Sequence, residues 1–259
     1  MNTPILDGFY DSKCFLTAEK CIAYKTKETK KYIKEHGVDT AILVFNGNIE
    51  QPDFLPEKIK IGQLEFGEDY HGIYVYDNIV MFVPFVGNPN ASGVMEELHY
   101  LGINKFIAAG SAGLIDGKFD PNKLFIIDKA IRDEGGSYHY LPAETYVNTD
   151  DDVTNAIKKA FDEHGISYEV GTTWTIDSLY KESEQRISKR ISQGATAVEM
   201  ECATWCAVAK SKGLKFGQFL FFSDIVSNNN WEWDNDYLNK SQNIKDKATL
   251  LCLEIAKKL

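Results

Sequence analysis

Two segments of this chain bring carboxylates next to strongly apolar stretches. Glu199 and Glu201 alternate with apolar residues in the run AVEME, and Asp224 follows the apolar residues 216–222. Acidic side chains are rarely buried unless they are paired or hold a ligand. These carboxylates therefore indicate a ligand-binding site, unless each of them is paired within the protein.

Each of these carboxylates also has an ordinary structural interpretation. Glu201 can be a helix N-terminal carboxylate that the helix dipole stabilises, and residue type alone favours that role. Asp224 can cap the turn after a strand, and Glu199 can be structural. The neighbouring elements decide between these interpretations.

Small residues form a second candidate for binding. The run Gly-Ser-Ala-Gly at residues 110–113 directly follows the apolar residues 105–109. Small side chains let backbone N–H groups approach a bound anion closely, so this turn is a candidate anion cradle. A plain tight turn is the alternative.

Short apolar runs alternate with helical patterns along the chain, and no low-complexity linker divides them. Predicted strands lie at residues 40–45, 72–76, 79–85, 105–109, 124–131, 167–173 and 215–222, with a hairpin turn at Asp77 and Asn78. Predicted helices lie at residues 92–101, 151–164, 183–192, 202–212 and from 238 onward. We therefore predict an α/β fold in which helices cover both faces of a central mixed, largely parallel sheet, as a three-layer α/β/α single domain over residues 1–259. Residues 1–38 form a helical extension of it.

Composition excludes several classes of protein. The formal net charge of −10 argues against nucleic acid as a partner. The lysine-rich residues 25–34 include acidic and apolar side chains, which is typical of a solvated helix face. Because no segment has the length of a transmembrane helix or the pattern of a signal peptide, we expect a cytoplasmic protein without a membrane partner.

The cysteines and histidines give no sign of a metal. The cysteines number 5 and lack any CxxC pair, so they fit reduced thiols better than a disulfide framework or a zinc ribbon. The histidines are scattered and form no metal-binding spacing. We expect no metal ion.

The order of several motifs resembles the nucleoside phosphorylase family, which includes uridine phosphorylases, purine nucleoside phosphorylases of the hexameric type and related nucleosidases. The resemblance covers most of the chain and rests on VPFVGNPNASGVMEEL, KFIAAGSAGLI, IRDEGGSYHYLP, TWTIDSLYKES, AVEMECA and FFSDIV. It implies a homo-oligomer, a dimer or hexamer, in which a neighbouring subunit completes each site. It also implies a nucleoside as substrate, inorganic phosphate as co-substrate and no further cofactor.

The resemblance assigns roles to particular residues. It implies that Met200 packs on the ribose, that Glu201 accepts hydrogen bonds from the ribose hydroxyls, and that Asp224 assists the leaving base. It implies base contacts from Trp174, Leu179, Tyr180, Glu199 and Ser223, and phosphate contacts from Gly47, Gly110 and Ser111. Asp224 matches purine-specific members, which favours a purine over uridine. Trp231 and Trp233 are either a lid over this pocket or a packed surface loop.

The chain departs from the family pattern where phosphate should bind. Gln51 and Ala108 stand where the resemblance implies arginines, and bidentate phosphate contacts depend on arginine. Arg132 or an arginine of a neighbour is a possible replacement. Three hypotheses follow: a phosphorylase that releases a free base and ribose 1-phosphate, a hydrolase in which Glu50 or Glu201 positions water, and a non-catalytic nucleoside-binding protein.

Overall fold

Runs of β-branched and aromatic residues form the strands of one mixed sheet in the computed structural model, which describes residues 3–227 and 230–259. In this part of the chain the sheet has 11 strands in the order β11-β10-β6-β8-β9-β5-β1-β4-β3-β2, with β7 paired to β6. The strands are β1 (Thr40–Val44), β2 (Ile59–Phe66), β3 (Asp69–Tyr76), β4 (Ile79–Phe82), β5 (Lys105–Leu114), β6 (Leu124–Asp133), β7 (Tyr146–Asn148), β8 (Tyr168–Ile176), β9 (Ala195–Glu199), β10 (Lys215–Ser227) and β11 (Asn230–Trp233).

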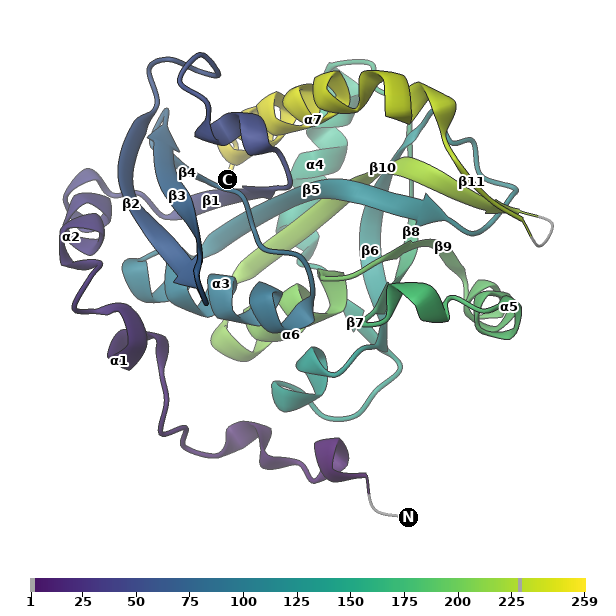
Figure 1. Ribbon diagram of the computed structural model, residues 1–259, viewed down its shortest axis with the longest axis horizontal. Coiled ribbons are helices and arrows are strands. Elements are labelled where there is room, and N and C mark those ends of the chain that lie inside the picture. The colour runs from purple at the N-terminus through teal and green to yellow at the C-terminus, as the bar shows by residue number, and fades with distance from the viewer. Residues whose placement is uncertain (1–2, 228–229) are drawn as a thin grey trace.

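Helices cover both faces of this sheet, as the sequence predicts (Figure 1). They are α1 (Ala18–Ile22), α2 (Lys27–His36), α3 (Asn88–Leu101), α4 (Asp151–Glu163), α5 (Glu184–Ser192), α6 (Cys202–Lys212) and α7 (Asn235–Ala256). Side chains alternate along the central strands, so that Ile42 and Val44 of β1 face α4 and α7 while Ala41 and Leu43 face α3 and α6. The chain is therefore a three-layer α/β structure.

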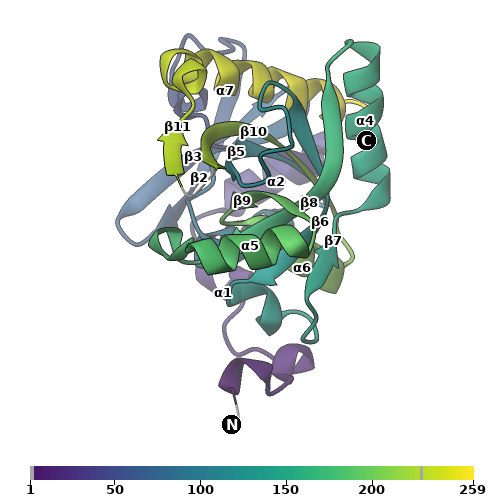
Figure 2. The same cartoon turned by 90° about the vertical axis from the view of Figure 1, so that its right-hand side faces the viewer.

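Part of the sheet closes on itself. β10 pairs with both β5 and β6, and the chain of pairings from β6 through β8 and β9 returns to β5. Figure 2 shows these strands curving around one another between α7 and α5. β1, β4, β3 and β2 then extend from β5 as an open sheet. Local sequence patterns do not reveal this closed ring of strands.

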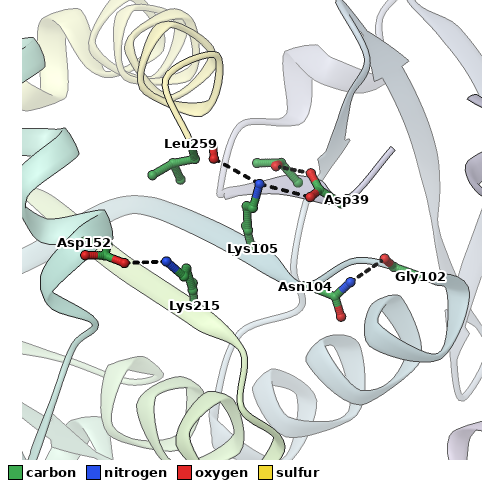
Figure 3. A network of polar contacts seen from close by, with 8 residues as sticks. Asp39, Gly102, Asn104, Lys105, Asp152, Lys215 and Leu259 are labelled. Atoms are coloured by element: carbon green, nitrogen blue, oxygen red, sulfur yellow. Dashed lines mark hydrogen bonds and ion pairs between the residues drawn. The ribbon is translucent and has the colours of Figure 1, made fainter. Parts of the chain in front are cut away.

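Charged side chains fix the starts of the central strands. Lys105 at the start of β5 pairs with Asp39, at 3.0 Å, and donates to the carbonyl of Leu259, at 2.9 Å. Lys215 at the start of β10 pairs with Asp152 of α4 (Figure 3). This network lies at the amino ends of the parallel strands, so the opposite edge remains for a ligand.

Several boundaries of strands and turns in the structure differ from those that the sequence predicts. The hairpin turn at Asp77 and Asn78 is confirmed, and both residues have positive φ angles of 49° and 63°, as a tight two-residue hairpin requires. The predicted turn at residues 110–113 is wrong, because these residues belong to β5 and pair with β10. The prediction that a strand ends at residue 222 is also wrong, because β10 passes Asp224 and continues to Ser227.

The N-terminal segment consists of short helices. It contains the 3-10 helices η1 (Pro4–Leu6) and η2 (Phe9–Asp11), followed by α1 and α2. In Figure 1 it leads from the edge of the sheet along the lower side of the molecule, where η1 and η2 contact the short helix η4 (Gly136–His139). Residues 1–2 of the predicted extension lie outside the described residues.

Candidate active site

Strand register brings the predicted site residues to one edge of the sheet. β1, β5 and β10 run parallel, with Val44 opposite Ala109 and with Asp224 opposite Gly113. Gly47 follows the end of β1, so it lies at the same edge as the last residues of β5. The antiparallel strand β9 adds Val198 opposite Gly113, which brings the AVEME segment beside Asp224.

Glu199 at the end of β9 caps helix α6. One of its carboxylate oxygens accepts the backbone N–H groups of Glu201, at 2.8 Å, and Cys202, at 2.6 Å. Its other oxygen accepts the hydroxyl of Thr175, and that hydroxyl oxygen accepts the N–H of Ala203. The N–H groups that begin a helix need such partners. The structural interpretation of Glu199 thus has direct support, and its contact with a base stays a prediction.

Glu201 has a different environment, although it is just as deeply buried. Its carboxylate accepts the N–H of Gly87, just before α3, at 2.6 Å, and it also interacts with the backbone of Met200. Its side chain makes no capping hydrogen bond to α6. Because a carboxyl group offers about four hydrogen-bonding positions, Glu201 has capacity left for ligand hydroxyls.

Burial changes the acidity of both glutamates. Burial, together with the nearby Glu199 carboxylate, raises the pKa of Glu201 to about 8. Burial also raises the pKa of Glu199, which its hydrogen bonds from Thr175 and the start of α6 oppose. Perturbed carboxylates of this kind are typical of functional sites.

Asp224 lies at an irregularity in β10, where Ser223 is left out of the pairing with β5. Its carboxylate accepts the hydroxyl of Ser223, at 2.7 Å, and the indole N–H of Trp231, at 2.9 Å. A methyl group added at Gly113 would stand 3.2 Å from this carboxylate. Trp231 and Trp233 belong to β11, which pairs with β10, so they do not form an irregular loop. Their role as a lid stays a prediction.

Glu182 is a carboxylate near Asp224 that the sequence analysis did not select. Burial raises its pKa to about 7, and the negative charge of Asp224 adds to the increase. Glu182 directly follows η5 (Leu179–Lys181) in the predicted base-side segment. A second acid beside Asp224 is a signal that only the folded chain reveals.

The predicted base-side residues are spread over different environments. Trp174 is fully buried and donates its indole N–H to Asp133, at 3.0 Å, so it has no exposed ring face on which a base could stack. Tyr180 is 94% exposed and Leu179 is 54% exposed. Ser223 is buried and bonds Asp224. Met200 is half-buried between Glu199 and Glu201. The prediction that a base stacks on Trp174 is therefore wrong, whereas the ligand contacts of Leu179, Tyr180, Ser223 and Met200 stay predictions.

The residues predicted to hold phosphate lie at the expected edge, in a changed setting. Gly47 begins the short helix η3 (Gly47–Glu50), which the side chain of Asn46 caps. Gly110 lies against the ring of Phe45, because an added methyl group there would meet that ring at 3.2 Å. Ser111 is exposed within β5.

A second group of polar residues supports the partners of Glu201, and all of them but the exposed Asp177 are buried. Asn88 follows Gly87 and donates its amide to Asp177, at 2.9 Å, while Asp177 also accepts the N–H of Gly135, at 2.7 Å. Glu134 accepts the hydroxyl of Thr204 in the first turn of α6, at 3.1 Å. Sequence analysis did not identify these residues, although the Gly-Asn-Pro before a helical pattern is a signal for a helix start.

Residues 3–227 and 230–259 contain neither a cluster of potential metal ligands nor a helix with the length and apolar character needed to cross a membrane.

Together the fold and the site define a mixed α/β protein with buried carboxylates at the carboxyl edge of its sheet. The chain belongs to the phosphorylase superfamily, whose family model matches residues 40–257. It is 27% identical over 152 residues to a guanosine phosphorylase of Halorubrum lacusprofundi, which covers 58% of this chain and 63% of that protein. It is 29% identical over 146 residues to a uridine phosphorylase of Salmonella typhimurium, which covers 51% of this chain and 58% of that protein. The match thus spans about three fifths of the length of these relatives.

Solved structures share the fold. A uridine phosphorylase of Vibrio fischeri ES114 superposes with a TM-score of 0.70 at 22% identity, over 85% of this chain and 92% of that chain. A futalosine hydrolase mutant of Helicobacter pylori superposes with a TM-score of 0.68 at 16% identity, over 85% of this chain and 99% of that chain. The fold prediction is therefore confirmed.

Proposed function

We propose that this chain cleaves the N-glycosidic bond of a nucleoside, with a purine preferred over uridine. The observation that carries the proposal is the contrast at the end of β9, where Glu199 caps the helix and leaves Glu201 with acceptor capacity. A buried carboxylate with free lone pairs fits a pair of sugar hydroxyls. The guanosine and uridine phosphorylases among its relatives agree with this substrate class.

Cleavage of the N-glycosidic bond requires stabilisation of the charge that develops on the sugar and on the base. Departure of the base leaves positive charge on the sugar and negative charge on the base. Glu201 would hold the ribose hydroxyls, with Met200 against the sugar, while Asp224 shares or donates a proton at the base. Glu182 stands near Asp224 and would keep a proton available there, because its pKa is raised to about 7.

The family resemblance predicts phosphate as the second substrate, with Gly47, Gly110 and Ser111 as its cradle. With phosphate as the second substrate, the enzyme is a pentosyltransferase of purine salvage that releases ribose 1-phosphate. It is then a cytoplasmic homo-oligomer in which a partner subunit completes each site. A hydrolase is the second candidate. It is favoured because Asn46 and Asn48, in the loop after β1, donate their side-chain amides to the carboxylate of Asp246 of α7 and not to a bound anion. A non-catalytic nucleoside-binding protein is the third.

Chromatography of reaction mixtures tests the proposal. Purified protein is incubated with adenosine, inosine, guanosine and uridine, and free base is measured over time. We expect base release from at least one purine nucleoside, and we expect Asp224→Asn to slow it by roughly 100-fold or more. Tight nucleoside binding without any base release would overturn catalysis and leave the binding protein.

A further inference from the structure

The arginines of this chain lie away from the predicted phosphate cradle. They are Arg132, Arg186 and Arg190. Arg132 donates to Ser137, at 2.7 Å, and to two carbonyls of the segment that follows it. Arg186 and Arg190 both pair with Asp133 at the end of β6. Arg132 is 4% exposed, and each of its three guanidinium nitrogens donates to a partner within the protein. It therefore does not replace the missing phosphate ligands.

The loop after β1 is instead held by helix α7. Asp246 of α7 accepts the side-chain amides of Asn46, at 3.0 Å, and Asn48, at 3.1 Å. Asn46 also donates to Thr249 and accepts from Gln242, both of α7. Donors that could point at an anion are therefore directed towards a carboxylate.

A second carboxylate stands in the same loop. Glu50 accepts the N–H of Gly72, at 2.8 Å, and the hydroxyl of Tyr74, at 2.9 Å. Burial and the nearby Glu50 raise the pKa of Tyr74 to about 12, so this phenol keeps its proton and continues to donate. Lys58 reaches the same loop, where its ammonium group bonds the carbonyls of Gln51 and Phe54. The carboxylates of Glu50 and Asp246 thus both contact this loop, and Lys58 is a cation that interacts with Glu50.

The floor of the cradle is apolar. Ala108 is completely buried, and the ring of Phe45 lies against the backbone of Gly110. A dianion loses its hydration there without gaining an arginine, and the ammonium group of Lys58 already bonds backbone carbonyls, so binding a dianion costs much free energy. A water molecule is neutral, so it avoids both the loss of a dianion's hydration and the need for cationic partners.

We infer that the acceptor in the reaction is water, so that the chain is a nucleoside hydrolase. This inference rests on the proposed function. The bond between C1′ and the base nitrogen breaks, and its electron pair leaves with the base, which gains a proton by way of Asp224. The water oxygen bonds to C1′ and releases one proton to solvent. The products are free base and ribose, and no other reactant is consumed.

Product analysis tests this inference separately from the proposed function. The nucleoside that releases base is incubated in water enriched in oxygen-18, with and without millimolar inorganic phosphate. We expect rates that agree within about twofold, and labelled ribose from mass spectrometry of samples quenched before ribose exchanges its anomeric oxygen. Base release that requires phosphate and yields ribose 1-phosphate overturns the inference and keeps the proposed function. Absence of base release under every condition overturns both.

A pair of α7 variants tests the role of the acidic loop. Asp246→Asn removes one negative charge beside Asn46 and Asn48, while Glu254→Gln removes one elsewhere on α7, where Glu254 pairs with Lys257. Inorganic phosphate is titrated as an inhibitor of base release. We expect an inhibition constant about threefold or more lower for Asp246→Asn than for the wild type and Glu254→Gln. Equal constants in all three folded proteins, checked by circular dichroism, contradict the exclusion of phosphate by this charge.

Discussion

Two glutamates at the start of α6 are buried to the same degree but have different partners. Glu199 accepts two backbone N–H groups and the hydroxyl of Thr175. Glu201 accepts the N–H of Gly87 and interacts with the backbone of Met200, but it makes no capping hydrogen bond to α6. Only the arrangement of donors around them separates a capping residue from a candidate ligand for ribose.

Replacement of Glu201 by Gln should weaken catalysis strongly. An amide keeps the size of the side chain, but its NH2 group cannot accept a hydrogen bond, so half of the acceptor positions for ribose hydroxyls are lost. Since a buried hydrogen-bonding group left without its partner costs about 1–3 kcal/mol, kcat/KM should fall by roughly 10- to 100-fold. Steady-state kinetics on the nucleoside that is cleaved measures this change. Glu169→Gln, at the exposed ion pair with Lys123, is the matched control and should be neutral.

The same glutamate makes stability depend on pH. The pKa of Glu201 rises from the usual 4.5 to about 8 in the folded chain, so between these values the folded protein holds a proton that the unfolded chain has lost. This contribution is fully present below the unfolded pKa and is lost as pH rises through 8. The free energy of unfolding should therefore fall between about pH 5 and pH 8.

Glu201→Gln should remove up to about 1.4 kcal/mol per pH unit from that slope. Urea unfolding of both proteins at several pH values measures it. A variant that keeps the full slope would show that Glu201 is ionised in the folded chain throughout this range.

Residue types identified part of this site. A carboxylate beside an apolar run is unusual enough that Glu199, Glu201 and Asp224 stand out in the sequence. Their separate tasks depend on donors from Gly87 and Thr175, which lie far away in the chain. Glu182 was missed because its environment arises from Asp224, which is also distant in sequence.

At the scale of elements, helix α6 depends on side chains from outside the helix for its first turn. Its first N–H groups bond Glu199 and Thr175, and its Thr204 bonds Glu134. Its last turn ends at Gly213, whose φ angle of 68° suits glycine. The helix thus fixes Glu201 through contacts at its start.

Glu199→Ala should destabilise the chain. The change leaves two buried N–H groups and the Thr175 hydroxyl without their acceptor, so we expect a loss of about 2–4 kcal/mol. The midpoint of urea unfolding measures this loss. Glu199→Gln keeps one acceptor oxygen and should lose less. An alanine variant as stable as the wild type would exclude the capping role.

Two glycines within strands allow a matched test of the role of Asp224, because only Gly113 lies beside it. Gly113→Ala places a methyl group 2.9 Å from Val198 and 3.2 Å from Asp224, while Gly217→Ala places one 2.7 Å from Val153 of α4. Both changes crowd the interior and should cost about 1–3 kcal/mol of stability. Only Gly113→Ala should also lower kcat, by about tenfold or more, because it displaces Asp224. Melting temperatures and kinetics of both proteins separate the effects, and equal activities would argue against Asp224 as the acid.

Apolar periodicity predicted the buried strands and most helices, since burial on one or both faces leaves a local pattern. It missed β2, whose sequence IKIGQLEF is largely exposed, and it missed β11. It treated residues 110–113 as a turn because glycine is typical of turns. In the structure, Gly110 and Gly113 are in a strand where Phe45 and Val198 leave no room for larger side chains.

For the whole molecule, strand β5 belongs to both the closed ring and the open sheet. The buried Trp205 packs in the cluster between the sheet, α3 and α6, while Trp174 packs in a separate cluster within the ring and near α5. The two clusters share β5 and β9 as neighbours. Neither cluster can lose its strands without exposing the other.

Unfolding should therefore be a single transition. We expect urea curves recorded by tryptophan fluorescence and by far-ultraviolet circular dichroism to coincide, because the ring links both clusters. Trp205→Phe and Trp174→Phe variants, each of which removes one of the buried reporters, should give curves that likewise coincide. A separate early transition that is lost in the Trp174→Phe variant would mean that the α5 side unfolds by itself.

The unused acceptor capacity of Glu201 has a practical consequence. A ligand that fills it supplies hydrogen bonds that folding alone does not provide, so the ligand raises the melting temperature whether or not it is turned over. Nucleosides, bases and sugars can therefore be ranked by thermal shift on the intact protein. Loss of the shift in Glu201→Gln would then distinguish ligands that occupy the ribose position from those that bind elsewhere.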